Sequence, residues 1–445
     1  MRLKIALFLL VLTSIATAAV VMENGWNYRL ILDQNKQTIR RTGFSRVPPS
    51  RPLVPPVADS IGAPVQVSPD GRTIAEFSAA TAPANPQLIA ASAIDHDGTG
   101  TNTAHCVVYV STDGGLHWSQ VSAWPTIVRG EFDPWVAIDG QGVIHATCVA
   151  TTSFGPRALY IQSVNQGASW TNPSIVTPLA GQFRRASCDK DAIAVASDGT
   201  IYVGFDEIVG QQFSRTLVVS SSTDHGQTWT PHDTGVAGGF CSGIVTGPND
   251  LVTVTYLGNA GYGSVTSTDG GNTWRTPVVL GTLFFQLPAI ARQSSGETII
   301  AQVAGPTPHL ELSIEDDTGS LVSQFTLDAP SSATCQNGRL IQPALTASPN
   351  SPAAFQIGCK VDPTRTEPGQ MEVWLYPDVS QAPAPVQVIS LTLPPITHLT
   401  PFASRFPDGG DYWSLTWLAD GWLSMWVDPR LAGGPGPLMA ASVVP

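Results

Sequence analysis

The sequence has little charge and very little lysine. Charged residues make up 13% of its 445 residues, and its cations are 18 Arg against only 4 Lys. A coiled coil or long helical bundle needs a chain dominated by Ala, Glu, Lys, Leu and Arg, and a disordered chain combines few apolar residues with a high charge density. Both classes are excluded, because 42% of the residues are hydrophobic. The net charge of -12 argues against nucleic acid as a partner, since nonspecific binding needs clustered Lys and Arg to neutralise phosphates.

Several motifs are also missing. The sequence contains no G-x-S-x-G elbow, no H-E-x-x-H helix and no G-x-x-x-x-G-K phosphate loop. None of its six cysteines lies in a C-x-x-C pair, which favours disulfides over a zinc site or a thioredoxin-like motif. No segment approaches the run of about 20 apolar residues that a membrane-spanning helix requires, so no membrane span is predicted.

The first 61 residues differ from the rest. Arg2 and Lys4 precede the apolar run 5–12 and the small residues 16–18, a pattern that predicts a signal peptide at 1–18 and a secreted or periplasmic protein. Residues 19–61 are rich in Arg and Pro, which favour an extended arm or linker.

From residue 62 onward the sequence repeats a hairpin pattern of two apolar strands around a polar turn. Seven such units occur, at 77–94, 135–147, 192–205, 243–256, 289–303, 344–359 and 412–428. Strand-rich repeats of this length predict an all-β propeller of four-stranded antiparallel blades. We expect one domain over residues 62–445 with seven blades, six being the alternative, and with residues 63–68 supplying the strand that the last blade lacks.

Four units continue into a second motif with one common spacing. A carboxylate or amide bonds the backbone N–H groups just ahead of it, Gly takes a positive φ, and Trp packs under the turn, so these residues are expected to build a rigid corner. The four copies are Ser111, Asp113, Gly115 and Trp118; Ser163, Asn165, Gly167 and Trp170; Ser222, Asp224, Gly226 and Trp229; and Ser267, Asp269, Gly271 and Trp274. Residues 313–319 form a decayed fifth copy.

This motif resembles the Asp-box, S-x-D-x-G-x-T-W, of the sialidase-like (BNR-repeat) β-propeller superfamily. The resemblance implies that the Asp-boxes are structural and lie on the face opposite the functional one. It also implies a glycan or another anionic ligand at the mouth of the central channel, and we expect a monomer.

In sialidases an arginine triad binds the substrate carboxylate, and arginines stand at the corresponding ends of several units here. The resemblance therefore makes substrate-binding candidates of Arg129, Arg185, Arg339 and Arg405. Pairing with neighbouring Asp residues on the rim is the alternative role.

A sialidase also uses a Tyr nucleophile activated by Glu, with an Asp as acid/base. Tyr412 opens the last unit, Glu76, Glu131 and Glu207 occupy comparable rim positions, and Asp97 follows the first unit. The family's Arg-Ile-Pro motif is missing from the first inner strand. Glu131 with Glu207 across the channel is an alternative glycosidase pair.

Two further predictions concern metals and disulfides. Asp95 and Asp97 lie in a loop that alternates oxygen side chains with Gly, so calcium is possible there, although no cofactor is required. The expected disulfides are Cys188–Cys241, Cys335–Cys359 and Cys106–Cys148.

The sequence thus supports two readings of function. One is an exported glycoside hydrolase of exo-α-sialidase type that acts on anionic glycans. The other is a noncatalytic propeller that binds a glycan or a protein, since a fold alone does not fix a function.

Overall fold

The computed structural model describes most of the chain. The described residues are 19–23, 26–33, 38–46, 60–96, 104–121, 124, 129–152, 155–177, 187–209, 214–282, 286–304, 309–349, 352–379, 384–396, 405–406, 408–430 and 436–444. At 19–46, 129–130, 209 and 214 only the backbone is described. The chain divides into two compact units, residues 1–58 and 59–445.

The first unit contains a three-stranded antiparallel sheet. Its strands are β1 (Ala19–Glu23), β2 (Trp26–Asp33) and β3 (Thr38–Arg46), paired in that order. The segment predicted to be an extended arm therefore contains regular strands. The predicted signal peptide lies outside the described residues.

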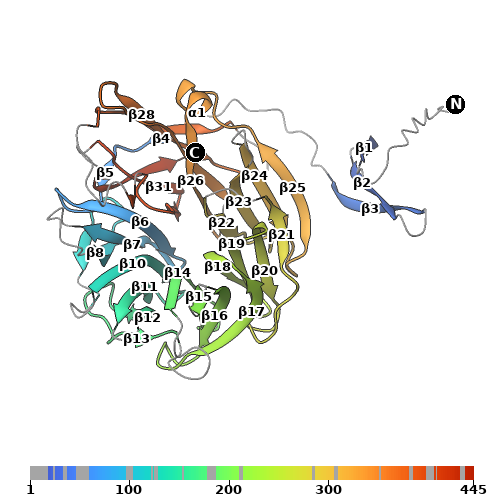
Figure 1. Ribbon diagram of the computed structural model, residues 1–445, viewed down its shortest axis with the longest axis horizontal. Coiled ribbons are helices and arrows are strands. Elements are labelled where there is room, and N and C mark those ends of the chain that lie inside the picture. Colours follow the sequence, from blue (N-terminus) through green and yellow to red (C-terminus); the bar gives the residue numbers. More distant parts are fainter. Residues whose placement is uncertain are drawn as a thin grey trace. The chain divides into compact units, whose positions relative to one another are not determined.

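The second unit is a β-propeller, whose sheets surround a central axis in Figure 1. Blades 1 to 3 are formed by β6 (Thr73–Ala82), β7 (Asn85–His96), β8 (Ala104–Ser111) and β9 (Ser119–Val121); β10 (Arg129–Ile138), β11 (Ile144–Thr152), β12 (Gly155–Ser163) and β13 (Ser174–Ile175); and β14 (Ser187–Val195), β15 (Ile201–Val209), β16 (Ser214–Ser222) and β17 (Thr230–Ala237).

Blades 4 to 6 follow the same order. They are formed by β18 (Phe240–Gly247), β19 (Leu251–Gly258), β20 (Gly261–Ser267) and β21 (Val278–Gly281); β22 (Ala289–Arg292), β23 (Thr298–Ala304), β24 (His309–Glu315) and β25 (Leu321–Leu327); and β26 (Arg339–Thr346), β27 (Ala354–Val361), β28 (Gly369–Tyr376) and β29 (Val386–Leu393). A short helix, α1 (Ala333–Asn337), precedes blade 6.

The seventh blade joins the two ends of the propeller. It contains β30 (Leu415–Leu418), β31 (Gly421–Val427) and β32 (Leu438–Val444), and both β4 (Ser60–Ile61) and β5 (Val65–Gln66) pair with β32. Its inner strand β30 contacts the inner strands of blades 6 and 1, which closes the ring. The described part of the chain thus forms seven propeller sheets, which confirms the seven-bladed prediction over the six-bladed alternative.

The core lies between neighbouring blades. Each sheet buries apolar side chains on both faces, and the largest cluster joins blades 1, 6 and 7 around Trp413, Trp422 and Trp426. Burial of such rings contributes roughly 25 cal/mol for each Å² of apolar surface removed from water. The interfaces between blades, rather than the separate sheets, therefore stabilise the ring.

The four Asp-boxes form one hydrogen-bonded turn between the third and fourth strands of blades 1 to 4. In blade 3, Ser222 Oγ accepts from Gly226 N at 2.9 Å, and Asp224 Oδ1 accepts from Thr228 N at 2.9 Å. Gly226 has a φ of 78°, and a Cβ there would lie 2.1 Å from Tyr160 Cε1 in blade 2. The motif therefore fixes both the turn and the contact with the preceding blade.

The described residues contain two disulfides, Cys106–Cys148 and Cys335–Cys359. The predicted Cys188–Cys241 bond is wrong, because both thiols are free and buried. Cys188 packs in the core between blades 2 and 3, whereas Cys241 packs in the core between blades 3 and 4. The two side chains occupy equivalent strand positions but face different interfaces, so the sheet of blade 3 separates them.

Within the described residues no helix has the length and apolar character needed to cross a membrane.

Candidate functional site

The candidate site is built on a bulge that recurs at the start of the inner strands. Glu76, Asp133, Lys190 and Gln342 have positive φ values of 44°, 52°, 49° and 53°, and each lies at an irregularity in the pairing of its blade's first two strands. A non-glycine residue in this region costs of order 1–3 kcal/mol, and such strain often occurs at functional sites. These bulges stand at the opposite end of the blades from the Asp-boxes, because the first and third strands run in the same direction.

Three of the bulge residues meet at one ammonium group. Lys190 Nζ lies 3.0 Å from Glu76 Oε1, 2.6 Å from Asp133 Oδ1 and 2.7 Å from Asp411 Oδ2. The four residues come from blades 3, 1 and 2 and from the segment that precedes β30. We call Glu76, Asp133, Lys190 and Asp411 the central cluster.

The central cluster is a boundary between packed interior and solvent. The side chains of Glu76 and Asp133 are 2% exposed, that of Lys190 is 12% exposed, and that of Asp411 is 55% exposed. Gly410 permits this packing, since a Cβ at its φ of 105° would lie 2.4 Å from Glu76 N and Cγ. A substrate group therefore meets Asp411 before it meets the buried carboxyls.

The two buried carboxyl groups differ in pKa. Burial raises the pKa of Glu76 to about 8, with Lys190 opposing the shift and Asp133 adding to it. Burial also acts against ionisation of Asp133, but the charge and hydrogen bond of Lys190 outweigh it and lower the pKa of Asp133. At neutral pH Glu76 thus holds a proton and Asp133 is ionised, a division typical of acid/base pairs.

Further carboxyl groups lie near this cluster in blade 3. Arg215 contacts Asp206 and, at 3.2 Å, Asp189. Asp191 is 1% exposed, and neither of its carboxyl oxygens has a hydrogen-bond partner among the described residues. Burial raises the pKa of Asp191 well above its ordinary range, so a buried carboxyl group that keeps its proton stands beside the cluster.

Tyr412 lies next to the central cluster. Its hydroxyl donates to Pro134 O at 3.2 Å, its ring packs 5.3 Å from that of Trp135, and Lys190 Nζ lies 6.0 Å from the ring centroid. Burial, followed by the charges of Glu76 and Asp133, raises the pKa of Tyr412 well above its ordinary value. This environment opposes formation of the phenolate that a tyrosine nucleophile needs.

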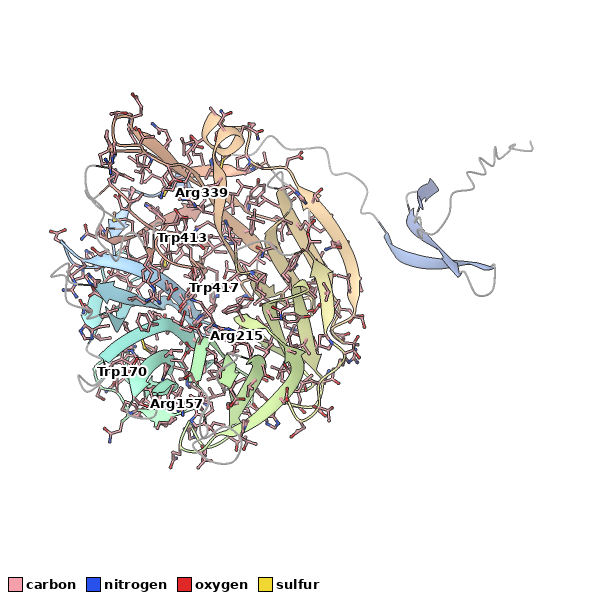
Figure 2. The ribbon with its side chains drawn as sticks, in the orientation of Figure 1. Arg157, Trp170, Arg215, Arg339, Trp413 and Trp417 are labelled. Carbon is pink, nitrogen blue, oxygen red and sulfur yellow. A yellow bond between two sulfur atoms is a disulfide. The ribbon has the colours of Figure 1, made fainter. Side chains whose placement is uncertain are left out.

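Two of the four predicted arginines, Arg339 and Arg405, have described side chains, and each has partners of its own. Arg339 pairs with Asp408 and with Asp362, and Arg405 lies over the rings of Phe132 and Phe406 at 4.9 and 5.1 Å. The side chain of Arg129 and the whole of Arg185 lie outside the described residues. Figure 2 labels Arg215 and Arg339, which come from blades 3 and 6 and each contact carboxylates.

The other predicted acidic residues lie apart from the central cluster. Glu131 accepts from Cys106 N at 2.7 Å, and burial raises the pKa of both Glu131 and Glu207 to about 7. Among the described residues, no hydrogen bond or ion pair joins either of them to the cluster. In the predicted calcium loop, Asp95 pairs with Arg72 at 2.6 Å and Asp97 lies outside the described residues, so calcium stays a prediction.

The sequence analysis identified Tyr412 and Glu76 but not Asp133, Lys190 or Asp411. The bulge position carries Glu, Asp, Lys and Gln in different blades, so it does not repeat as a residue type. A signal existed nonetheless. Lys190 and Lys360 are the only lysines after residue 58, and Lys190 stands between two Asp residues ahead of an apolar strand.

Comparisons with known proteins concern the fold. Neither a model of a known protein family nor a curated protein matches the sequence. A protein of unknown function from Dyadobacter fermentans DSM 18053 is similar in structure, with 12% identity over 87% of this chain and 99% of that chain and a TM-score of 0.52.

Two sialidases are also similar in structure. The Hadza microbial sialidase Hz136 shows 16% identity over 64% of this chain and 63% of its own, with a TM-score of 0.48. A leech intramolecular trans-sialidase shows 13% identity over 65% of each chain, with a TM-score of 0.46. This chain therefore spans less than two thirds of either sialidase. These low identities bear on fold alone, and the predicted propeller is confirmed by the seven propeller sheets of the described residues.

Proposed function

We propose that the protein is a glycoside hydrolase that acts on a glycan at the central cluster. The observation that carries this proposal is the convergence of Glu76, Asp133 and Asp411 on Lys190, in which Glu76 keeps its proton near neutral pH and Asp411 is the carboxyl group exposed to solvent. A protonated carboxyl group and an ionised one flanking a glycosidic bond are what glycoside hydrolysis requires.

In this mechanism Glu76 is the general acid and Asp411 is the exposed carboxylate that attacks the anomeric carbon. The two oxygens lie 3.0 and 2.7 Å from Lys190 Nζ and so at most about 5.7 Å apart, a limit compatible with the separation of about 5–5.5 Å found in retaining glycosidases. Glu76 donates its proton to the leaving oxygen, then accepts one from the water that releases the sugar. Lys190 and Asp133 position both groups.

The surrounding charges favour a neutral substrate over a sialoside. Lys190 is shared by three carboxyl groups, Arg215 contacts two, and Arg339 contacts two. A substrate carboxylate that binds one of these three cations would have to displace one of its partners. The sialidase-type reaction predicted from the family resemblance therefore belongs in the test as a second substrate class.

The test is an assay of purified protein on aryl glycosides, with neutral hexosides and pentosides in one arm and an aryl sialoside in the other, from pH 4 to 9. We expect turnover in the neutral arm, a loss of at least about 100-fold in Glu76→Gln and in Asp411→Asn, and no loss in Asp420→Asn, an exposed control. Binding of glycans without any turnover would replace this proposal with the noncatalytic alternative.

A further inference from the structure

A groove of about 560 Å³ lies between blades 4 and 5, away from the central cluster. Its lining residues are Ser264, Thr266, Trp274, Arg275, Thr276, Val278, Gly319 and Ser320. They come from β20, from the end of the fourth Asp-box and the segment that leads into β21, from the first residue of β21, and from the turn before β25, strands of neighbouring blades in Figure 1. This volume lies within the range of small-molecule sites.

The groove exists because one packing position changes in blade 4. The residue three places before the Asp-box serine is Val108, Tyr160 or Val219 in blades 1 to 3, and each of these packs in the apolar core against the next blade. In blade 4 the same position is Ser264. Its hydroxyl instead donates to Glu315 of blade 5, whose other carboxyl oxygen has no partner among the described residues.

Small residues on the blade 5 side keep the groove open. Residues 313–319 have lost the Asp-box tryptophan, and Gly319, with a φ of 74°, would bring a Cβ to 2.5 Å from Thr266. A larger side chain at Gly319, or a tryptophan at the position that the fifth copy has lost, would fill the space.

The lining combines an aromatic ring, hydroxyl groups and a cation. Trp274 is partly buried, and it packs against the core between blades 3 and 4 as well as lining the groove. Its indole N–H, like that of Trp170, has no partner among the described residues, whereas Trp118 and Trp229 donate to a glycine carbonyl of their own boxes. Arg275 is exposed, and its guanidinium forms no ion pair or hydrogen bond with a described residue. Burial acts to raise the pKa of the nearby Asp316, but hydrogen bonds from Thr318 and Ser320 and the charge of Arg275 lower it overall. Arg275 and Asp316 therefore interact through their charges, although no ion pair between these two described side chains is formed.

We propose that this groove is a second saccharide-binding site, for a pyranose that carries a carboxylate. The apolar face of the sugar packs on Trp274, its hydroxyl groups bond to Ser320 and Thr276, and its carboxylate pairs with Arg275 through two parallel hydrogen bonds. The exposed side chains of Val279 and Leu321, next to the lining residues on the outer strands, extend the contact surface along a chain of sugars.

The test is a glycan array that presents neutral, uronic-acid and sialic-acid terminal sugars, followed by titration of the best glycan. We expect retention of carboxylate-bearing glycans only, with affinity at least about tenfold weaker in Arg275→Ala and in Thr276→Trp, which fills the groove from an exposed position. Arg365→Ala, an exposed arginine without ion pairs, is the charge-matched control and should bind as the wild type does.

A third variant distinguishes binding in the groove from hydrolysis at the central cluster. Glu76→Gln should keep groove binding even if it abolishes turnover, so failure of the hydrolase proposal leaves this one standing. The groove proposal is overturned if no glycan is retained, if neutral sugars bind as well as acidic ones, if Glu76→Gln alone abolishes binding, or if only extended peptides bind.

Discussion

Lys190 Nζ lies 2.6 Å from Asp133 Oδ1, and the two residues occupy the same strained bulge position in neighbouring blades. The contact therefore joins blade 2 to blade 3 at the inner end of both sheets. Glu76 and Asp411 extend the connection to blade 1 and to the segment before β30, so one ammonium group links four parts of the ring.

Replacing Lys190 should lower the free energy of unfolding much more than removing a surface charge does. Lys190→Met leaves the buried carboxylate of Asp133 without its counter-charge, and we expect a loss of about 3–5 kcal/mol in the free energy of unfolding at pH 7. Urea unfolding followed by tryptophan fluorescence measures it. The control Arg365→Met, which removes an exposed cation, should stay within about 0.5 kcal/mol. Equal effects of the two substitutions would contradict the structural role of the cluster.

Glu76 should make stability depend on pH above neutrality. Its pKa rises from 4.5 to about 8 on folding, so between these values the native protein holds a proton that the unfolded chain has released. The free energy of unfolding then falls as pH rises from about 5 to 8. Glu76→Gln should flatten this fall, and the exposed Glu297→Gln should not. Melting temperatures measured from pH 5 to 8 test this pH dependence. Parallel profiles for the wild type and Glu76→Gln would contradict the raised pKa of Glu76.

Two of the six cysteines should carry free thiols. Cys188 and Cys241 are 3% and 2% exposed, and burial raises the pKa of both thiols well above the ordinary range. We expect no reaction with a thiol reagent in the folded protein, two thiols after unfolding without reductant, and six after reduction. Peptide mapping of the labelled sites should identify Cys188 and Cys241. Labelling of the other four before reduction would contradict the two disulfides.

The buried serine of an Asp-box should contribute more to the free energy of unfolding than an exposed serine does. Ser222 Oγ accepts from Gly226 N at 2.9 Å and donates to Asp224 Oδ1 at 2.8 Å, and its side chain is buried. Ser222→Ala leaves a buried backbone N–H unpaired, which costs about 1–3 kcal/mol. The exposed Ser295→Ala is the control. A loss of under about 0.5 kcal/mol in Ser222→Ala would show that the turn holds without this bond.

The propeller was predictable because its signals are local. Alternating hairpins and the Asp-box residues, such as Ser222 and Trp229, act within a few positions of each other and repeat along the chain. The central cluster was less accessible, because Glu76, Lys190 and Asp411 meet only after the ring has closed and share no residue type. Cys188 and Cys241 show the same limit, since an equivalent position in adjacent blades does not reveal which interface a side chain faces.

The pairing of Ile61 with Val443 has a consequence for the order of events in folding. The two residues are separated by almost the whole propeller, so the last blade cannot be completed until the ribosome has made the final strand. Until then β4 and β5 have no strand to pair with. The incomplete ring also exposes a sheet edge that can pair with other chains. Contacts of such long range also predict slow folding. The nascent protein is thus exposed to misassembly until β32 has been made and has paired with β4.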